Sequence, residues 1–330
     1  MTGQLTVTVA GDEQVELSRS RLAPRLGSDW RILNWQRADG IERLHALLDE
    51  SDAMITNGFG RQPLRSKRLK LVQIPFAGYD WLDTALLPPG CALCNTYEHE
   101  IPIAEYVMLG ILEWEIGMRR IDPDFRAGNW TYCMPSQGPF HGEAYGKTIG
   151  LLGYGHIGEE IARRAKAFGM QVNAVARRAR PTPELLDSYG HTAADLEHLL
   201  SSSDYLVITC ALTEQTRGMI AAAELARMQP SAVIINVARG KIVDEQALYT
   251  ALQNKTIAGA VLDTWYQYPH DPGNDASVRP SQYPFWELDN VIISPHCSAW
   301  TRQLLERRWD FVAANLIRLA RGETLQNRIQ

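Results

Sequence analysis

Apolar positions in the first hundred residues follow two alternating patterns. Short apolar or β-branched runs occur at 5–10, 31–35, 53–56, 70–74 and 92–95. Between them, segments such as 40–50 carry apolar residues at 41, 44, 47 and 48, the spacing of one helix face. Strands that alternate with helices are typical of βαβ units in a parallel sheet. The pattern therefore predicts a first α/β unit.

The same alternation returns further along the chain. It predicts strands at 149–152, 171–176, 205–209, 232–236, 257–262 and 290–294, helices at 196–201, 222–228 and 245–254, and a last amphipathic helix at 302–321. Segment 102–119 is too apolar for a surface helix, so we expect it to be buried between domains or subunits. Residues 121–145, rich in Asp, Pro, Gly and aromatic residues, predict an irregular arm. The fold class is α/β with doubly wound parallel sheets.

A glycine-rich turn follows the strand at 149–152, in KTIGLLGYGHIG. A strand, a G-x-G-x-x-G turn and a helix in this order form the fingerprint of dinucleotide binding. Gly153 allows the tight turn, Gly155 lets the backbone approach a pyrophosphate, and Gly158 lets helix and strand pack closely. The alternative is a structural βα turn without a ligand.

Three polar residues stand just beyond predicted strand ends, where doubly wound sheets place reactive groups. They are Arg239, Asp263 and His296. An arginine binds a carboxylate through two parallel hydrogen bonds, and a histidine can transfer a proton at neutral pH. Together with a nicotinamide, these two groups suffice to interconvert a 2-keto acid and a 2-hydroxy acid.

Composition narrows the classes of protein. A length of 330 residues favours about two domains. The net charge of −5, without a basic block, argues against a nucleic-acid partner, and no apolar run is long enough to span a membrane. The N-terminal sequence does not resemble a signal peptide, so we expect a cytoplasmic protein. Cys91 and Cys94 form a C-x-x-C without a second pair, which favours buried apolar residues over a metal site.

Several motifs in a fixed order resemble the D-isomer-specific 2-hydroxyacid dehydrogenases over nearly the whole chain. They are GKTIGLLGYGHIG, LTEQTRGMI at 212–220, INVARGKIVDE at 235–245, AGAVLDTW at 258–265 and SPHCSAW at 294–300. The resemblance implies two Rossmann-like domains. A discontinuous, flavodoxin-like substrate domain would comprise 1–100 and 300–330, and the inserted dinucleotide-binding domain 101–299. It also implies a homodimer.

The resemblance also implies roles for individual residues. Arg239 would bind the substrate carboxylate and polarise the keto group, His296 would donate the proton, and the backbone of Ala77 and Gly78 would bind the carboxylate. Asp263 would bind the carboxamide of the nicotinamide. The full set of expected cofactor contacts is Gly153, Gly155, His156, Ile157, Gly158, Arg177, Arg178, Ala238 and Asp263.

One departure from the family concerns the cofactor. Members that use NAD carry an acidic residue at the end of the second nucleotide-domain strand. Ala176 stands there, 23 positions after Gly153, and Arg177, Arg178 and Arg180 follow. An arginine there is placed to pair with a 2′-phosphate, so we expect NADP, with NAD as the alternative. A solvated basic turn is the other interpretation.

A second departure concerns the catalytic histidine. The family places a Glu five residues after the Asp to hold the imidazole, and here this position is Tyr268, preceded by Gln267. A tyrosine supplies no charge, so we expect His296 to titrate lower than in relatives that keep the acid. Asp271 or Asp275 could replace it.

These observations predict an oxidoreductase that transfers a hydride between NADP(H) and a small 2-keto or 2-hydroxy acid of the D series, acting as a reductase similar to the glyoxylate/hydroxypyruvate branch. Two alternatives stay open: an oxidoreductase for another small anion such as formate or phosphite, and a non-catalytic nucleotide-binding scaffold similar to the family's co-repressors.

Overall fold

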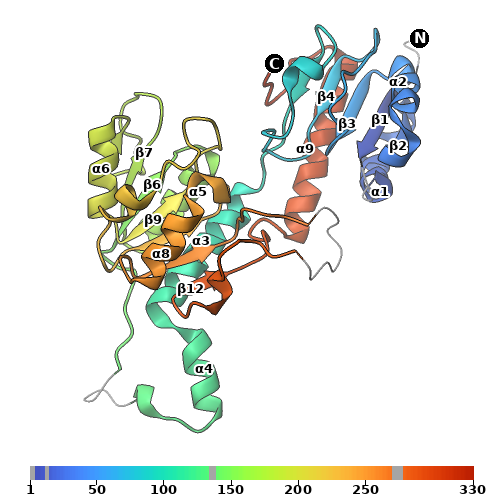
Figure 1. Cartoon of the computed structure of the whole chain (residues 1–330). Helices are drawn as coiled ribbons and strands as arrows, with labels where there is room; N and C mark the ends of the chain where they lie inside the picture. The colour runs from blue at the N-terminus through green and yellow to red at the C-terminus, as the bar shows by residue number, and fades with distance from the viewer. Residues whose placement is uncertain (1–3, 12–14, 134–138, 270–277) are drawn as a thin grey trace. The chain divides into compact units, whose positions relative to one another are not determined.

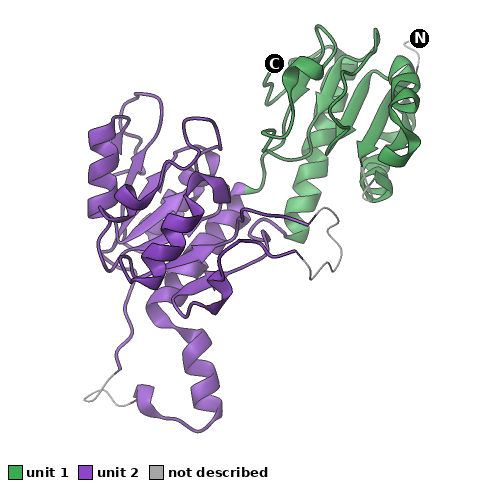
Figure 2. Cartoon of the chain, viewed as in Figure 1, with its two compact units in different colours: residues 1–99, 301–330 green, residues 100–300 purple. Residues whose placement is uncertain are grey.

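The chain folds into two compact units, each built around one sheet. The computed structural model describes residues 4–11, 15–133, 139–269 and 278–330. Unit 1 comprises Met1–His99 and Thr301–Gln330, and unit 2 comprises Glu100–Trp300 (Figure 2). All strand pairs in both sheets are parallel. The predicted α/β class with two parallel sheets is therefore confirmed.

The described residues of unit 1 form five strands in the order β2-β1-β3-β4-β5. Figure 1 labels the first four of them. They are β1 (Leu5–Gly11), β2 (Trp30–Gln36), β3 (Ala53–Thr56), β4 (Leu71–Gln73) and β5 (Ala92–Cys94). Helices α1 (Val15–Leu26) and α9 (Arg302–Arg321) pack in one apolar cluster with β1, whereas α2 (Ile41–Glu50) packs in another. Helix α1 was missed because Pro24 lies inside it and only three of its residues are buried.

Helix α9 joins unit 1 from far along the chain. The Thr301 side chain caps its first turn by accepting a hydrogen bond from the Leu304 backbone at 3.1 Å. Further along the helix, the buried Asn315 amide donates to the Gln73 side chain at 2.7 Å. Beyond the helix, the Ile329 backbone donates to the Leu93 carbonyl at 2.7 Å. These contacts bind residues 301–330 to the β4–β5 edge.

Unit 2 holds seven strands in the order β12-β11-β10-β9-β6-β7-β8. They are β6 (Thr148–Leu152), β7 (Gln171–Val175), β8 (Ser188–Gly190), β9 (Tyr205–Ile208), β10 (Val233–Asn236), β11 (Gly259–Leu262) and β12 (Val291–Ile293). The strand order reverses between β6 and β9. In such sheets, ligands bind beyond the carboxyl ends of the strands at this reversal.

Two apolar clusters hold the helices of unit 2 on its sheet. One includes residues of α3 (Glu100–Ile116) and α5 (His156–Ala167). The other includes residues of α6 (Ala193–Ser202), α7 (Ala222–Leu225) and α8 (Glu245–Gln253). Both faces of the sheet are therefore covered, which is why its strands read as continuous apolar runs.

The segment 102–145 begins with one helix and continues into a second. Helix α3 begins at Glu100 and ends at Ile116, and its buried residues belong to the core of unit 2 itself, alongside those of α5. The chain then turns at Gly117, whose φ of 76° favours glycine, into α4 (Met118–Arg126). The expected irregular arm is thus partly helical. An Asp122–Arg126 ion pair, at 2.9 Å and one turn apart, supports α4.

Candidate active site

The glycine turn between β6 and α5 has the shape that a dinucleotide requires. Gly153 has a φ of +106°, and a Cβ added there would lie 2.5 Å from the Cys210 backbone nitrogen, so only glycine fits. At Gly155, by contrast, an added Cβ would meet nothing within 4 Å. Helix α5 begins next to this open space, and no side chain caps its N-terminus. Uncapped N–H groups beside open space suit a pyrophosphate.

Hydrogen bonds from two neighbouring strands hold the glycine turn in place. The Gly153 N–H donates to the Val175 carbonyl at 2.8 Å, and the Thr209 hydroxyl donates to the Gly153 carbonyl at 2.7 Å. The turn is therefore tied to β7 on one side and to the end of β9 on the other. His156 is exposed and Ile157 half-buried, both in the first turn of α5.

A short basic turn follows β7. Ala176 remains tied to β8 through a 3.0 Å hydrogen bond to the Gly190 carbonyl, and Arg177 and Arg178 are exposed. The Tyr189 hydroxyl donates to the Arg178 carbonyl at 2.7 Å. The Arg180 guanidinium donates to the Tyr154 carbonyl at 3.2 Å. The turn is thus linked both to β8 and to the glycine turn.

Arg239 lies in a bend after β10 that a buried asparagine shapes. The Asn236 side chain accepts a hydrogen bond from the Ala238 N–H at 3.1 Å and donates to the Arg239 carbonyl at 3.0 Å. The Arg239 guanidinium in turn donates to the Ala238 carbonyl at 2.8 Å. The half-buried Arg239 side chain is therefore held close to its own backbone at the sheet edge.

Asp263, at the end of β11, organises the loop that follows β12. Its side chain is 0% exposed and accepts three hydrogen bonds. The donors are the Ser294 hydroxyl at 2.5 Å, the Cys297 N–H at 2.8 Å and the Ser298 N–H at 3.0 Å. The Tyr106 and Ser294 hydroxyls lie 2.6 Å apart, so the network reaches helix α3. A buried carboxylate is stable only with such partners.

His296 lies inside this loop with a φ of 59°, in the left-handed region that non-glycine residues rarely adopt. The two residues that follow it donate their N–H groups to Asp263, which stabilises this conformation. His296 is exposed to solvent. Partial desolvation and the nearby Arg239 guanidinium lower the pKa of His296, while the Asp263 carboxylate opposes them.

Tyr268 lies beside His296, at the position where the resemblance leads one to expect an acid. The two ring centroids are 5.6 Å apart, with a 53° angle between the planes. The Tyr268 hydroxyl accepts a hydrogen bond from the Trp265 N–H at 2.9 Å. The tyrosine therefore offers the imidazole an uncharged aromatic neighbour. Gln267 is exposed, and Asp271 and Asp275 lie outside the described residues.

Comparison with known proteins agrees with this geometry. Residues 108–298 match the family model of the D-isomer specific 2-hydroxyacid dehydrogenase, NAD binding domain. A glyoxylate reductase of Pyrococcus furiosus is 39% identical over 309 residues, covering 90% of this chain and 88% of the relative. The chain belongs to the D-isomer specific 2-hydroxyacid dehydrogenase family.

Solved structures of the family share the fold over nearly the full length. A family protein from Aeromonas salmonicida has a TM-score of 0.79 and 25% identity, with 99% of each chain covered. An NADPH-dependent glyoxylate/hydroxypyruvate reductase from Sinorhizobium meliloti, in complex with NADP and sulfate, has a TM-score of 0.76 and 24% identity. The match covers 99% of this chain and 98% of the reductase. At this identity the similarity is one of fold.

The structure brings together most of the predicted residues of this dehydrogenase that lie in unit 2. Arg239, Asp263 and His296 follow three neighbouring strands, β10, β11 and β12. Tyr268 joins them from the loop after β11. The glycine turn and the basic turn lie along the other part of the same sheet edge, after β6 and β7.

Sequence reasoning missed the residues that hold these groups. Asn236 and Ser294 lie inside motifs of the dehydrogenase family, but nothing in the spacing shows that their side chains bind the loops. Tyr106 lies in an apolar helix, and only folding brings its hydroxyl to Ser294. Tyr189 left no signal, because the three-residue strand β8 is too short to form a pattern.

Ala77 and Gly78, the other predicted contacts, lie in unit 1 after β4. The Asn95 side chain donates to the Ala77 carbonyl at 2.9 Å, and the Trp81 indole donates to the Gly78 carbonyl at 3.1 Å. Both carbonyls are thus held by side chains of the same unit, which fixes the orientation of the two peptide groups.

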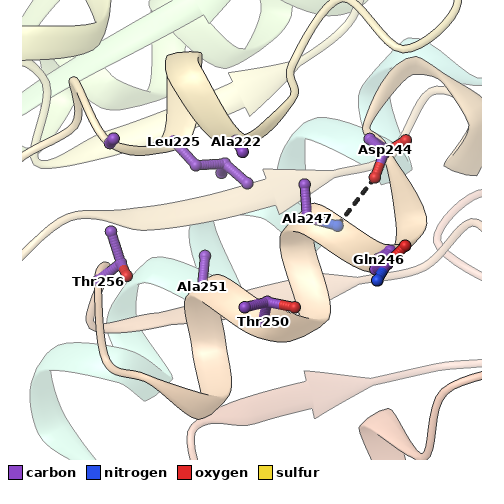
Figure 3. Close-up of a pocket in the computed structure, with 9 residues that line it drawn as sticks. Ala222, Leu225, Asp244, Gln246, Ala247, Thr250, Ala251 and Thr256 are labelled. Carbon is purple, nitrogen blue, oxygen red and sulfur yellow. Dashed lines mark hydrogen bonds between the residues drawn. The ribbon is translucent and has the colours of Figure 1, made fainter.

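Other features of the described residues add no chemistry to this site. A hollow of about 420 Å³ between α7 and α8 is lined largely by alanine and threonine, and Asp244 there caps α8 (Figure 3). Burial raises the pKa of Cys91 to about 12 and that of Cys94 to about 11, as expected for apolar packing.

No helix among the described residues is long and apolar enough to cross a membrane. Within the same residues, no cluster of metal ligands is found.

Proposed function

We propose that this chain is an NADPH-dependent reductase of small 2-keto acids such as glyoxylate or hydroxypyruvate, yielding the D-2-hydroxy acid. One observation carries the proposal: a basic turn without an acidic residue and a glycine turn share a sheet edge with Arg239 and His296. The glyoxylate reductase named above as a relative supports the choice of substrate class.

Arg239 is proposed to bind the substrate and to polarise its keto oxygen. When bound, the nicotinamide of the cofactor supplies the hydride for the keto carbon. The Arg239 guanidinium is permanently charged and can pair with both the carboxylate and the oxygen that gains charge. His296, close enough to Arg239 for its pKa to be lowered, is proposed to donate the proton to this oxygen.

Asp263 and Tyr268 are proposed to support His296 in different ways. Asp263 fixes the loop backbone on both oxygens, and its predicted contact with the carboxamide of the nicotinamide stays a prediction. Tyr268 is proposed to orient the imidazole through its ring. Because it brings no charge, protonated His296 is stabilised less than it would be by a carboxylate.

The backbone N–H groups of Ala77 and Gly78 in unit 1 are proposed, from the family resemblance, to bind a carboxylate. Their carbonyls already accept bonds from Asn95 and Trp81. A fixed peptide orientation lowers the cost of ordering the loop around an anion.

The cofactor preference is proposed to depend on Arg177 and Arg178. No acidic residue stands at Ala176 to repel a 2′-phosphate, and two exposed guanidinium groups follow it. Gly153, Gly155, His156, Ile157 and Gly158 would receive the pyrophosphate, and Ala238 would lie at the nicotinamide end.

Initial rates would test the reductase directly. Purified protein is mixed with NADPH or NADH and with glyoxylate, hydroxypyruvate, pyruvate and 2-ketobutyrate in turn, and the loss of absorbance at the reduced nicotinamide band is followed. We expect reduction of at least one acid, faster with NADPH at equal low concentration. Binding of NADPH without reduction of any acid in the panel would contradict the proposal and favour the scaffold alternative.

We also propose that the protein forms a homodimer. Leu109 on α3 is 63% exposed and Trp130 62% exposed, and Trp130 packs edge-on against Phe125 with centroids 4.9 Å apart. Large exposed apolar side chains are typical of an interface. Figure 1 shows α4 projecting from unit 2. Light scattering should give the mass of two chains, and a single-chain mass at micromolar concentration would contradict the dimer.

A further inference from the structure

Two tyrosines enclose the guanidinium of Arg180 in the basic turn. Its central carbon lies 4.9 Å from the ring centroid of Tyr154 and 4.9 Å from that of Tyr189. Contacts of this kind stabilise an arginine electrostatically and leave the N–H groups at its edge available for hydrogen bonds. Both tyrosine rings pack against the buried apolar cluster that includes residues of α3 and α5.

The same tyrosines also fix the backbone around this arginine. Tyr154 lies between the first two glycines of the fingerprint, and its carbonyl accepts the Arg180 hydrogen bond at 3.2 Å. Tyr189, on the edge strand β8, holds the Arg178 carbonyl through its hydroxyl at 2.7 Å. Thus the ring of Tyr189 places one arginine and its hydroxyl places the backbone of another.

We propose that Tyr189 is a positioning residue for the 2′-phosphate of NADP(H): it holds Arg178 and Arg180 in the turn where the phosphate binds. The inference rests on the proposed function and deepens it, because it assigns the cofactor preference to a platform of Arg178 and Arg180 held by Tyr154 and Tyr189. Long arginine side chains lose conformational freedom when they bind a ligand. Arg180 is already ordered between two rings, so this loss is smaller for it.

The platform explains why the basic turn differs from a solvated cluster of charges. In a solvated turn, each guanidinium would point into water and the tyrosine hydroxyl would be dispensable. Here the Arg180 guanidinium is stacked and hydrogen-bonded, and the Arg178 carbonyl is bound from the next strand. Only one of the five Arg180 N–H donors is used in these contacts.

Binding of two small probes to the full-length protein would test this role. Adenosine 2′,5′-bisphosphate carries the 2′-phosphate and 5′-AMP lacks it, so their affinity ratio, measured by calorimetry, reports on this subsite alone. The variants are Tyr189→Leu, Tyr189→Phe and Arg180→Gln. Tyr249→Phe is the matched control, a half-buried tyrosine of unit 2 on α8.

We expect Tyr189→Leu and Arg180→Gln each to weaken binding of the bisphosphate about tenfold, the size of one charge-assisted hydrogen bond, with little change for 5′-AMP. Tyr189→Phe keeps the ring and loses the hydroxyl, so a loss of about threefold is expected. The double variant Tyr189→Leu/Arg180→Gln should bind the bisphosphate at most about threefold more weakly than Arg180→Gln alone, because Tyr189 acts largely through Arg180.

Several results would overturn the inference. Unchanged bisphosphate affinity in both Tyr189 variants would do so, as would an equal loss for both probes, which indicates general damage to the site. Fully additive losses in the double variant would show that Tyr189 does not act through Arg180. Equal affinities of the two probes in the wild type would overturn the NADPH preference as well. A wild-type preference with unaffected variants would overturn the role of Tyr189 alone.

Discussion

The two parts of the sheet edge in unit 2 are built differently. After β6 and β7, a glycine turn beside open space is followed by exposed arginines. After β10, β11 and β12, a fully buried carboxylate with three donors holds a histidine in the left-handed region. Under the proposed function, the first region would bind a ligand that brings its own charge, and the second would place a proton donor. Accurate placement of a proton donor requires a fixed backbone.

The largest expected effect separates the two groups of the catalytic region. His296→Asn removes the proton donor, so kcat should fall about 10²- to 10⁴-fold with little change in KM. Arg239→Ala removes both a binding group and a charge for the developing oxyanion, so KM should rise and kcat should fall. Steady-state rates with the best keto acid check both. Near-normal turnover of His296→Asn would exclude it as the proton donor.

A smaller effect is expected in the phosphate region. Arg177→Ala should weaken NADPH binding about ten- to hundred-fold and leave NADH binding nearly unchanged, because only NADPH carries the second phosphate. Fluorescence titration of both cofactors measures this. Arg227→Ala, an exposed arginine of unit 2 paired with Glu197, controls for the loss of charge. Equal losses for NADPH and NADH would place Arg177 elsewhere than at the 2′-phosphate.

The link between Tyr106 and Asp263 should make a measurable contribution to stability. Ser294→Ala leaves both partners without this hydroxyl, which should cost about 1–3 kcal/mol. Thermal melting should then fall by roughly 2–4 °C per kcal/mol for a domain of this size. Ser298→Ala is the control, because its bond to Asp263 comes from the backbone. Identical melting of the two variants would contradict the importance of the Ser294 hydroxyl.

The smallest expected effect concerns Tyr268. Reduction requires protonated His296, so its kcat/KM should fall as pH rises through the histidine pKa, which lies below its ordinary value. Tyr268→Glu adds a negative charge beside the ring, which favours the protonated form and should move this fall upward by about one pH unit. Tyr268→Gln is the uncharged control. Coinciding pH profiles for the wild type and Tyr268→Glu would show that another carboxylate already acts there.

Most of the fold could be predicted from the sequence because buried parallel strands leave apolar runs of recognisable length. The features that escaped have physical reasons. Strand β8 has three residues, and α1 and α4 each contain a proline that masks a helical pattern. The glycine turn and the arginines could be predicted because each residue type suits one chemical task. Asn236 and Ser294, by contrast, bind groups that only folding brings near them. A polar residue that organises a loop leaves no spacing to detect.

The placement of α9 in unit 1 has a consequence for synthesis on the ribosome. The first 99 residues emerge early, but one apolar face of their sheet is completed by Trp309, Val312 and Leu316, which are made some two hundred residues later. Unit 2 lies entirely between these two parts of the chain. Because domains fold as units, unit 2 should reach its native state before unit 1, although it begins later in the sequence. Pulse-proteolysis of stalled nascent chains, in which residues 1–300 are followed by a linker long enough to clear the ribosomal exit tunnel, would then show a protected unit 2 beside a still cleavable N-terminal segment.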